Sequence, residues 1–546
     1  MELDRLRDKP FYLDEGRLAW VKERLARMSA QEKAGQLFCV LGDAESPESL
    51  AELVGELNVG GVLFRPAPAQ ELRRRFAELD GLAKLPLLKA ANLEEGGSGA
   101  LSDGCCFGSQ MQVAAADDPG CTEDFALACA AEARSVGINW SFSPVVDVDM
   151  NFRNPITNVR TFGSDPDRVL ENARIYVRTL QRFGIAAACK HFPGDGVDYR
   201  DQHLHPSYND LSAEDWYASF GRIYKSLIDE GLLSVMAGHI VQPNVIRAID
   251  PAAGPEKLLP GSQSRELLTG VLRERFGFNG LIISDATIMG GYTMSQPRRR
   301  AIPASIEAGC DMLCFGTDIR EDIGYVLEGL ENGLLSEARL DEAAARILAL
   351  KARLSGEYTL PDIDIPAARR RCAGRAVTLV KDIQGLVPLR PEAYPDIRLV
   401  SLGQDETPEG SLSGMAAAFL EGRGFRVERY EPLRDELHGT RGLPAGRLTL
   451  MLCNLPAASN QTTVRIQWCP KHALEIPRFV CEEATAFISF ANPYHLQDVP
   501  RVRTYINAYT ATRDTVEAAL ERLLGEAPFT GRSPSEPFCG LYDTRL

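Results

Sequence analysis

Short apolar segments with strand character alternate with helix-patterned segments through the first two thirds of the chain. Continuous apolar runs separated by helices are typical of parallel strands joined by crossover helices. Eight such runs within about 350 residues favour a (β/α)8 TIM-like barrel, enlarged by insertions, over an open doubly wound sheet. In chain order the runs are residues 36–40, 61–65, 86–92, 140–148, 186–191, 234–239, 281–285 and 311–315.

Helix signals agree with this alternation and indicate where the barrel ends. Ser29 and Glu32 form a capping-box pattern that opens a helix just before the first strand. Residues 340–354 have the spacing of a helix with one buried stripe, and Gly356 and Pro361 follow it.

The remaining length requires a second core, because 546 residues exceed what one core usually holds. We predict a barrel over residues 1–354, a linker over 355–370 and a smaller α/β domain with an open sheet over 371–546. Its strand candidates are residues 398–402, 448–453 and 485–490, and a final helix is expected near 515–524.

Composition excludes several classes of partner. The formal net charge of −15 repels phosphate backbones, and the short Arg runs are typical of solvated helix faces, so we expect no nucleic acid partner. The charged first residues, and the lack of any run of about 18 apolar residues, predict neither a signal peptide nor a membrane partner. The 13 cysteines are odd in number and lack a C-x-x-C pair, so buried thiols are expected instead of disulfides or zinc. These features predict a cytoplasmic protein and leave homo-oligomerisation open.

Asp285 is the first candidate for chemistry. It closes the apolar run 281–284, and small residues with the paired glycines Gly290 and Gly291 follow it. A carboxylate at the mouth of a barrel strand, beside residues that let a ligand approach, is placed to attack an electrophilic carbon. The alternative is an N-cap for the next helix, because a strand-Ser-Asp-helix junction is common.

Asp201 and His203, two residues apart, form the second candidate. In an extended segment their side chains share a face, so the carboxylate can accept from one ring nitrogen and leave the other to transfer a proton. An unperturbed imidazole titrates near about pH 6.5, which suits a group that gains and loses a proton near neutrality. As an isolated pair, the same spacing is typical of a surface hydrogen bond.

Further polar side chains end other predicted strands. Lys190 and His191 would point to opposite faces of a strand, so both reach one ligand only if the strand ends there, as the following Phe-Pro-Gly indicates. Arg160 can clamp hydroxyls or a carboxylate, or pair with a nearby acid. Asp147 can orient a base or cap a helix. The other polar positions at strand ends are Asn92, Glu94, Glu95 and His239.

With these residues assembled, the chain resembles glycoside hydrolase family 3, in particular its β-N-acetylglucosaminidase branch. The matching segments, in the family's order, are residues 28–33, 35–38, 143–148, 159–166, 190–194, 201–203 and 284–285. The resemblance implies a (β/α)8-like N-terminal domain. No set of His, Cys and carboxylate residues has the spacing of metal ligands, and hydrolysis of this kind needs no metal, so we expect no metal or cofactor. Residues 490–494, 505–509, 524–526 and 531–534 look like a shortened version of the second α/β domain that many members carry.

The resemblance also implies roles. Asp285 is implied as the nucleophile of a retaining reaction with a covalent glycosyl-enzyme intermediate. The branch replaces the usual acid/base carboxyl by an Asp-x-His dyad, so His203 is implied as acid/base and Asp201 as the residue that orients it. Substrate-binding or site-ordering roles are implied for Arg160, Lys190, His191, Asp147, Glu95, His239 and Met236.

The implied function is hydrolysis of terminal β-N-acetylglucosaminides, with a small-molecule carbohydrate as substrate. A β-glucosidase or another exo-glycosidase is the first alternative. A glycoside phosphorylase is the second, because a neutral imidazole repels phosphate less than a carboxylate would. A sugar-binding protein without turnover is the third.

Three departures from the branch leave the sugar open. Gly194-Asp195-Gly196 stands where Gly-His-Gly is common, and Gln202 replaces the usual Ser inside the dyad. The common Asp-Gln-Glu-Gly-Gly after the third strand, whose Asp binds sugar hydroxyls, is replaced by Asn-Leu-Glu-Glu-Gly-Gly at residues 92–97.

Overall fold

The computed structural model of the chain describes residues 3–430, 446–470, 473 and 475–546. The chain divides into two compact units, which we describe separately. The first contains Met1–Phe107, Phe125–Asn151 and Val169–Ile363, and the second contains Gly108–Asp124, Phe152–Arg168 and Asp364–Leu546. The predicted domain boundaries at 354 and 371 stay a prediction, because these units reflect which segments pack together, not which segments fold alone.

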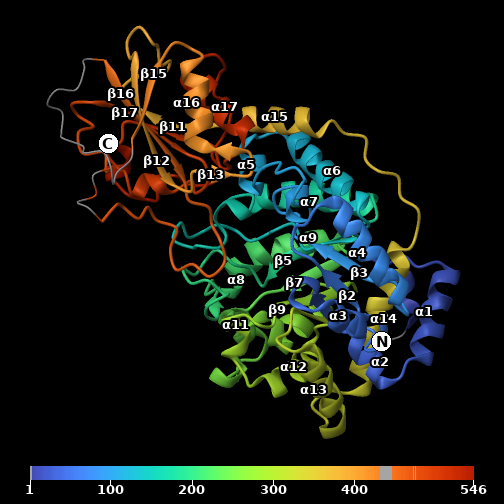
Figure 1. The fold of residues 1–546 in the computed structure, drawn as a ribbon. Helices are drawn as coiled ribbons and strands as arrows, with labels where there is room; N and C mark the ends of the chain where they lie inside the picture. Colours follow the sequence, from blue (N-terminus) through green and yellow to red (C-terminus); the bar gives the residue numbers. More distant parts are fainter. Residues whose placement is uncertain (1–2, 431–445, 471–472, 474) are drawn as a thin grey trace. The chain divides into compact units, whose positions relative to one another are not determined.

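The first unit is built on a closed barrel of eight strands, and each strand runs parallel to its neighbours, in the order β1-β10-β9-β7-β5-β4-β3-β2. Figure 1 shows part of this barrel, where β2, β3, β5, β7 and β9 are labelled. Consecutive strands of the barrel are therefore neighbours, and the last pairs with the first. This confirms the predicted (β/α)8 fold. The strands are β1 (Phe38–Leu41), β2 (Gly61–Leu63), β3 (Leu88–Ala91), β4 (Trp140–Ser141), β5 (Ala186–Phe192), β7 (Ser234–Ala237), β9 (Leu281–Ala286) and β10 (Met312–Cys314).

Helices connect these strands. Ser29 caps the helix before β1 through a complete capping box with Glu32, as its sequence predicts. The predicted helix at 340–354 is also present and begins slightly earlier, with Ser336 as its N-cap. The main helices are α1 (Glu15–Arg27), α2 (Ala30–Gln36), α3 (Pro47–Gly55), α4 (Ala69–Leu82), α6 (Pro119–Ser135), α7 (Pro166–Arg182), α9 (Arg222–Asp229), α10 (Pro243–Ile249), α12 (Arg298–Ala308), α13 (Ile319–Asn332) and α14 (Glu337–Leu354).

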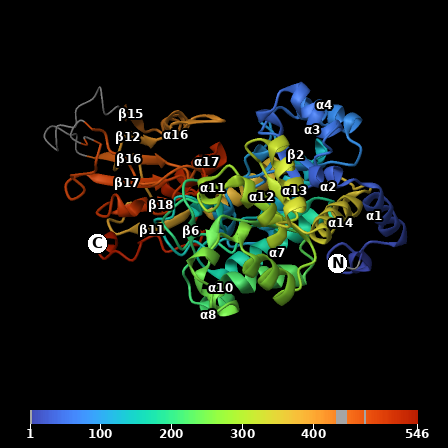
Figure 2. The same ribbon diagram turned by 90° about the horizontal axis from the view of Figure 1, so that it is seen from below.

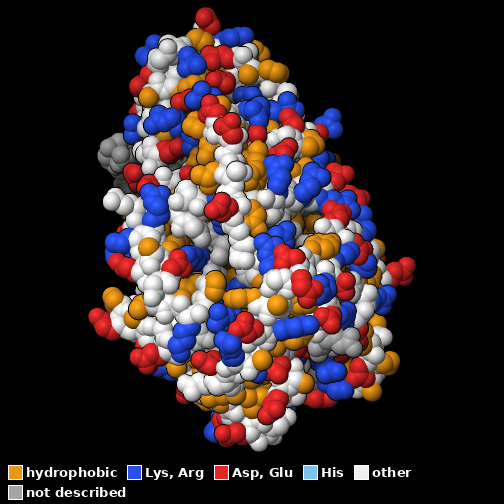
Figure 3. All heavy atoms as spheres, turned by 90° about the vertical axis from the view of Figure 1, so that its right-hand side faces the viewer, with side chains coloured by type: hydrophobic (Ala, Val, Ile, Leu, Met, Phe, Trp, Pro, Cys, Tyr) orange, Lys and Arg blue, Asp and Glu red, His pale blue; other side chains and the backbone are white. Residues whose placement is uncertain are grey.

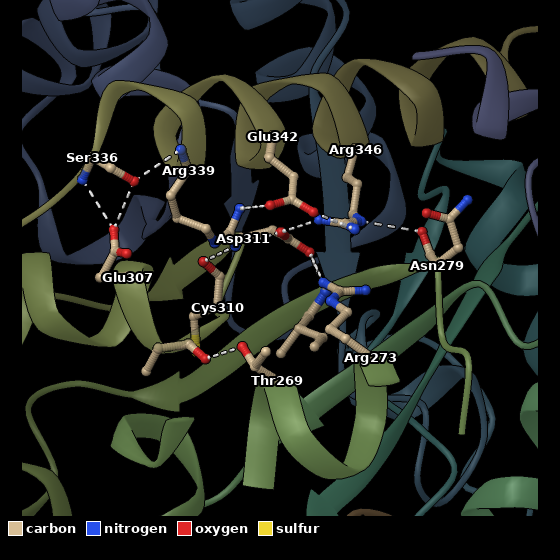
Figure 4. Close-up of polar contacts among 12 residues, drawn as sticks. Thr269, Arg273, Asn279, Glu307, Cys310, Asp311, Ser336, Arg339, Glu342 and Arg346 are labelled. Atoms are coloured by element: carbon tan, nitrogen blue, oxygen red, sulfur yellow. Dashed lines mark hydrogen bonds and ion pairs between the residues drawn. The ribbon is translucent and has the colours of Figure 1, made fainter. Parts of the chain in front are cut away.

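A buried charge cluster lies where β10 begins (Figure 4). Asp311 immediately precedes β10, is fully buried, and pairs with Arg273 at 2.5 Å, Arg339 at 2.7 Å and Arg346 at 3.4 Å. It also accepts the N–H of Ile282 at 2.9 Å. Burial alone would raise the pKa of Asp311, but the three guanidinium groups lower it by more, so it lies below its usual value. At the N-terminal face of a barrel, such a cluster serves stability.

The second unit contains a six-stranded sheet in the order β11-β18-β17-β16-β12-β15, in which only the β11–β18 pair is antiparallel. Figure 2 shows these strands one above another. This confirms a smaller α/β domain with an open sheet. The strands are β11 (Thr378–Asp382), β12 (Asp396–Gly403), β15 (Arg426–Tyr430), β16 (Arg447–Asn454), β17 (Ala484–Ser489) and β18 (Thr504–Asn507).

Two apolar clusters cover the two faces of this sheet. One contains residues of α16 (Leu412–Glu421) and α17 (Arg513–Leu523), and α15 (Ile365–Ala376) packs beside α17. The other contains residues of less regular segments, such as Ile466 and Leu496. The predicted strands correspond to β12, β16 and β17, whereas the pattern missed β11, β15 and β18. β15 lies at an edge, where most of its residues are exposed and few are apolar, so no apolar run reveals it.

Charged side chains of both signs are interspersed over the face shown in Figure 3. The described residues on that face form no continuous basic stripe, which agrees with the net charge of −15. Within the described parts of the chain, no helix has the length and apolar character needed to cross a membrane.

Replacing Asp311 with Ala removes the carboxylate that Arg273, Arg339 and Arg346 share, and leaves only Arg339 and Arg346 with a further acidic partner, Glu342. We expect the free energy of unfolding of the barrel to fall by about 3–5 kcal/mol. Urea unfolding followed by fluorescence measures this, because Trp140 and Trp216 are buried in the barrel unit. Asp341→Ala is the control, since the Asp341 side chain is 49% exposed in its pair with Lys33 and should contribute about 1 kcal/mol or less. An equal loss in both variants would contradict the prediction.

Candidate active site

The end of β5 brings two predicted site residues to the same rim. Lys190 Nζ contacts Glu94 Oε1 at 2.5 Å and Asn92 Oδ1 at 3.1 Å, both just after β3. His191 contacts Asp147, which follows β4. The predicted strand run ends at His191, and the strand continues one residue further, to Phe192. Its register with β7 shifts between Cys189 and Phe192, and an irregularity of this kind re-aims side chains.

A buried aspartate orients His191 toward Asp285. Asp147 is fully buried, and its Oδ2 lies 2.6 Å from His191 Nδ1. Its Oδ1 accepts the backbone N–H groups of His191 at 3.0 Å and of Asp195 at 2.8 Å. The opposite ring nitrogen, His191 Nε2, lies 3.9 Å from Asp285 Oδ2. Asp147 therefore fixes both the backbone and the ring of His191. As a result, the ring presents Nε2 to Asp285.

Asp285 lies near the end of β9, where its Oδ1 accepts the N–H of Ala286 at 2.7 Å. Burial raises the pKa of this carboxyl, but the neighbouring imidazoles, His191 first, and the Ala286 N–H lower it by more. The pKa of Asp285 is therefore below its usual value. An ionised carboxylate at the C-terminal rim of a barrel is the state and the place that a nucleophile needs.

The Asp201–His203 pair has the geometry of an oriented acid/base. Asp201 Oδ1 lies 2.6 Å from His203 Nδ1 and accepts the His203 N–H at 2.9 Å. The Asp201 side chain is fully buried, whereas that of His203 is 23% exposed. With Nδ1 held by the carboxylate, Nε2 is the ring nitrogen that can exchange a proton with a ligand.

The paired glycines after Asp285 bring the dyad segment close. Gly290 N–H donates to His203 O at 2.8 Å, and Gly291 N–H donates to Gln202 O at 3.1 Å. A Cβ on Gly290 would lie 2.2 Å from Leu204 O, and one on Gly291 would lie 2.6 Å from Gln202 O. The sequence led us to assign these glycines to ligand approach, but they serve the approach of the segment that contains the dyad.

His239 is held by both ring nitrogens. Its Nδ1 lies 2.8 Å from the Ser262 hydroxyl, and its Nε2 lies 2.9 Å from Ala286 O. Burial lowers its pKa, which favours a neutral ring that donates from Nε2 to the carbonyl and accepts from Ser262 at Nδ1. His239 therefore supports the backbone beside Asp285. Met236, also a predicted site residue, is buried in β7 opposite Ile283.

Two other predicted residues make contacts of a different kind. Glu95 is exposed, and its carbonyl accepts the N–H of Phe107 at 2.7 Å. Its neighbour Glu94, which the sequence marked only as a polar strand end, is the residue that pairs with Lys190. Arg160 belongs to the second unit, where it ends a short helix and its Nη1 donates to Ile156 O at 3.0 Å.

The site has a candidate nucleophile and a candidate acid/base, which are the groups that substitution at a carbon centre needs. Asp285 is an ionised carboxylate, and the Asp201–His203 pair can give and take a proton. In the described parts of the chain, no three His, Cys, Asp or Glu side chains are grouped as a metal site would require.

Comparisons with known proteins identify the family of the chain. Residues 29–350 match the family model of the glycosyl hydrolase family 3 N terminal domain. A Cellulomonas fimi protein named beta-N-acetylglucosaminidase/beta-glucosidase is 43% identical over 98% of this chain and 99% of its own length. The chain belongs to glycosyl hydrolase family 3 and is a glycoside hydrolase.

Solved structures extend the comparison to the whole fold. The structure of a beta-glucoside phosphorylase, BglX, bound to 2FGlc is 42% identical, covers 99% of this chain and 100% of that one, and has a TM-score of 0.93. A family 3 beta-N-acetylglucosaminidase from Paenibacillus sp. str. FPU-7 covers 94% of this chain and 100% of its own, with a TM-score of 0.79. Its identity of 23% supports the shared fold only.

Replacing His191 with Gln removes the first of the imidazoles that lower the pKa of Asp285, while the burial that raises it remains. We expect the pKa of Asp285 to rise. A nucleophilic carboxyl acts as the anion, so in that role activity is present above the pKa of Asp285 and is lost as the pH falls through it. The acid limb of kcat/KM for aryl glycoside cleavage should therefore move to higher pH. His205→Gln, an exposed histidine in the same region, is the control. An unmoved acid limb in His191→Gln would contradict the expected shift.

Proposed function

We propose that the chain is a retaining exo-glycosidase that cleaves terminal β-N-acetylglucosaminides through a covalent intermediate on Asp285. The observation that carries the proposal is the oriented Asp201–His203 pair, bound through backbone hydrogen bonds to the segment after Asp285. A β-glucosidase is the alternative for the sugar, because the Cellulomonas fimi relative has both activities in its name.

In the first step, Asp285 attacks the anomeric carbon while the glycosidic oxygen leaves with the proton from His203 Nε2. The bond from carbon to the leaving oxygen breaks as the bond to Asp285 forms, and the aglycone departs as an alcohol. The low pKa of Asp285 supplies the anion for the attack. Asp201, buried beside Nδ1, stabilises the imidazolium before it gives up its proton.

In the second step, water attacks the anomeric carbon from the side that the aglycone has left. His203 Nε2 accepts the proton of that water, and the carboxylate of Asp285 is released. Two displacements at one carbon retain its configuration. Proposed sugar contacts are Arg160, Lys190, His191, Glu95 and Met236, while Asp147 and His239 order the groups beside Asp285.

The roles proposed for Asp285 and His203 predict that the activity of their variants depends differently on the leaving group of the substrate. Asp285→Ala should reduce the release of 4-nitrophenol from its N-acetylglucosaminide by at least about 10³-fold. His203→Ala should slow a methyl glycoside by about 10²–10⁴-fold and the nitrophenyl glycoside far less, because nitrophenolate leaves with little acid help. Steady-state kinetics on both substrates measure this. Asp210→Ala, at an exposed aspartate, is the control. Full activity of Asp285→Ala would overturn the proposal, and the same assays with the aryl glucoside compare the two sugars.

Phosphorolysis is a second candidate, favoured by the 42% identity to a beta-glucoside phosphorylase over nearly the whole chain. An imidazole that has given up its proton is neutral, so it does not repel a phosphate dianion as a carboxylate would. Phosphate would then replace water in the second step and form a glycosyl phosphate.

If phosphate is the acceptor, turnover in phosphate buffer should yield glycosyl phosphate as the main product, and turnover should slow in a buffer without phosphate. Product analysis by mass spectrometry or phosphorus NMR separates the two outcomes. Free sugar as the only product in phosphate buffer would exclude phosphorolysis and retain hydrolysis.

We also propose a cytoplasmic location. The 13 cysteines without a C-x-x-C pair support a reducing compartment, where thiols persist.

A further inference from the structure

Two departures from the related branch lie in contact with each other. Asp195 stands where a histidine is common, and Gln202 stands between the two members of the dyad in place of the usual serine. In the folded chain, Gln202 Nε2 donates to Asp195 Oδ2 at 3.3 Å. Both side chains are buried, at 2% exposure for Asp195 and none for Gln202. The two changes therefore form one pair.

Asp195 is the fixed end of this pair. Its N–H donates to the buried Asp147, and its own Oδ1 accepts the N–H of Gly196 at 2.7 Å. Asp195 is thus attached to the carboxylate that orients His191. Its second oxygen, Oδ2, faces the amide of Gln202.

Gln202 is held from a second side. Its Oε1 accepts the N–H of His239 at 2.7 Å, beside a glycine that leaves room for it. A Cβ on that glycine, Gly238, would lie 3.0 Å from Gln202 Oε1 and 2.9 Å from His191 Cβ. One side-chain amide thus connects the segment of His203 to the segments that follow both β5 and β7.

The residues after the dyad have an anchor of their own. Ser207 and Tyr208, which form β6, pair with Ile240 and Val241 of β8. The backbone of Gln202 and His203 also accepts from the two glycines after Asp285. Gln202 lies between Asp201 and His203 in the chain. The contacts of its side chain therefore influence the positions of both members of the dyad.

We propose that Asp195 and Gln202 are positioning residues that hold His203 Nε2 at the distance from Asp285 needed to protonate the leaving group. The proposal rests on the acid/base role proposed for His203. Neither residue transfers the proton. Their hydrogen bond fixes the segment that presents the imidazole, in the way that supporting contacts keep catalytic groups in productive geometry.

Gln202→Glu tests the pair because it keeps Oε1 for His239 but replaces the donor by an oxygen that faces Asp195. We expect kcat/KM for a methyl glycoside, which leaves only when protonated, to fall by about 10-fold or more, and that for the nitrophenyl glycoside by less than about 3-fold. Combining Asp195→Asn with Gln202→Glu reverses donor and acceptor, since the amide introduced at position 195 can donate to the carboxylate introduced at position 202. The double variant should recover most of the loss on the methyl glycoside.

His205→Gln, at an exposed position of the same segment, is the control and should change neither rate. Equal losses on both substrates in Gln202→Glu, or a double variant no better than Gln202→Glu, would overturn the positioning role. If His203→Ala itself shows no leaving-group dependence, the proposed acid/base function fails. If His203→Ala shows that dependence and Gln202→Glu does not, only the positioning role fails.

Discussion

The buried carboxylate of Asp147 is the interaction on which the site depends. It accepts hydrogen bonds from the ring and backbone of His191 and from the backbone of Asp195. Buried carboxylates are stable only when such partners replace water. Because these donors lie at the end of β5 and just after it, one side chain after β4 fixes the imidazole beside Asp285 and the start of the loop that leads to the dyad.

The two ends of the barrel use buried charge for different purposes. At the N-terminal end, Asp311 is surrounded by three arginines that neutralise it and join neighbouring segments. At the C-terminal rim, Asp285 has imidazoles as its neighbours, with His191 Nε2 at 3.9 Å. Burial raises the pKa of both carboxyls, and their basic neighbours lower it by more. Arginine is always charged, so the ion pairs of Asp311 are permanent. Imidazoles can lose their charge, so they leave the Asp285 carboxylate available to a reacting carbon in its proposed role.

The acid/base role proposed for the His203 imidazole brings a requirement that a carboxyl on a strand would not have. His203 belongs to a segment outside the barrel strands, so its position depends on contacts between loops. The glycine pair after Asp285, the short β6–β8 sheet and the Gln202 amide supply those contacts. In the proposed mechanism, a neutral imidazole would lie beside the covalent intermediate, and its lack of charge would admit either water or an anion as acceptor.

By itself, the sequence determined the eight barrel strands, the capping box at Ser29, the α/β character of the second unit and the candidates Asp285, Asp201 and His203. These follow from periodicity, caps and short motifs, which are local properties of the chain. Only the tertiary structure decided that Lys190 pairs with Glu94, that Gly290 and Gly291 make room for the dyad segment, and that Asp195 meets Gln202. Strand-end side chains meet according to how the barrel closes and how its loops fold back, and no local pattern encodes which of several nearby polar residues will touch.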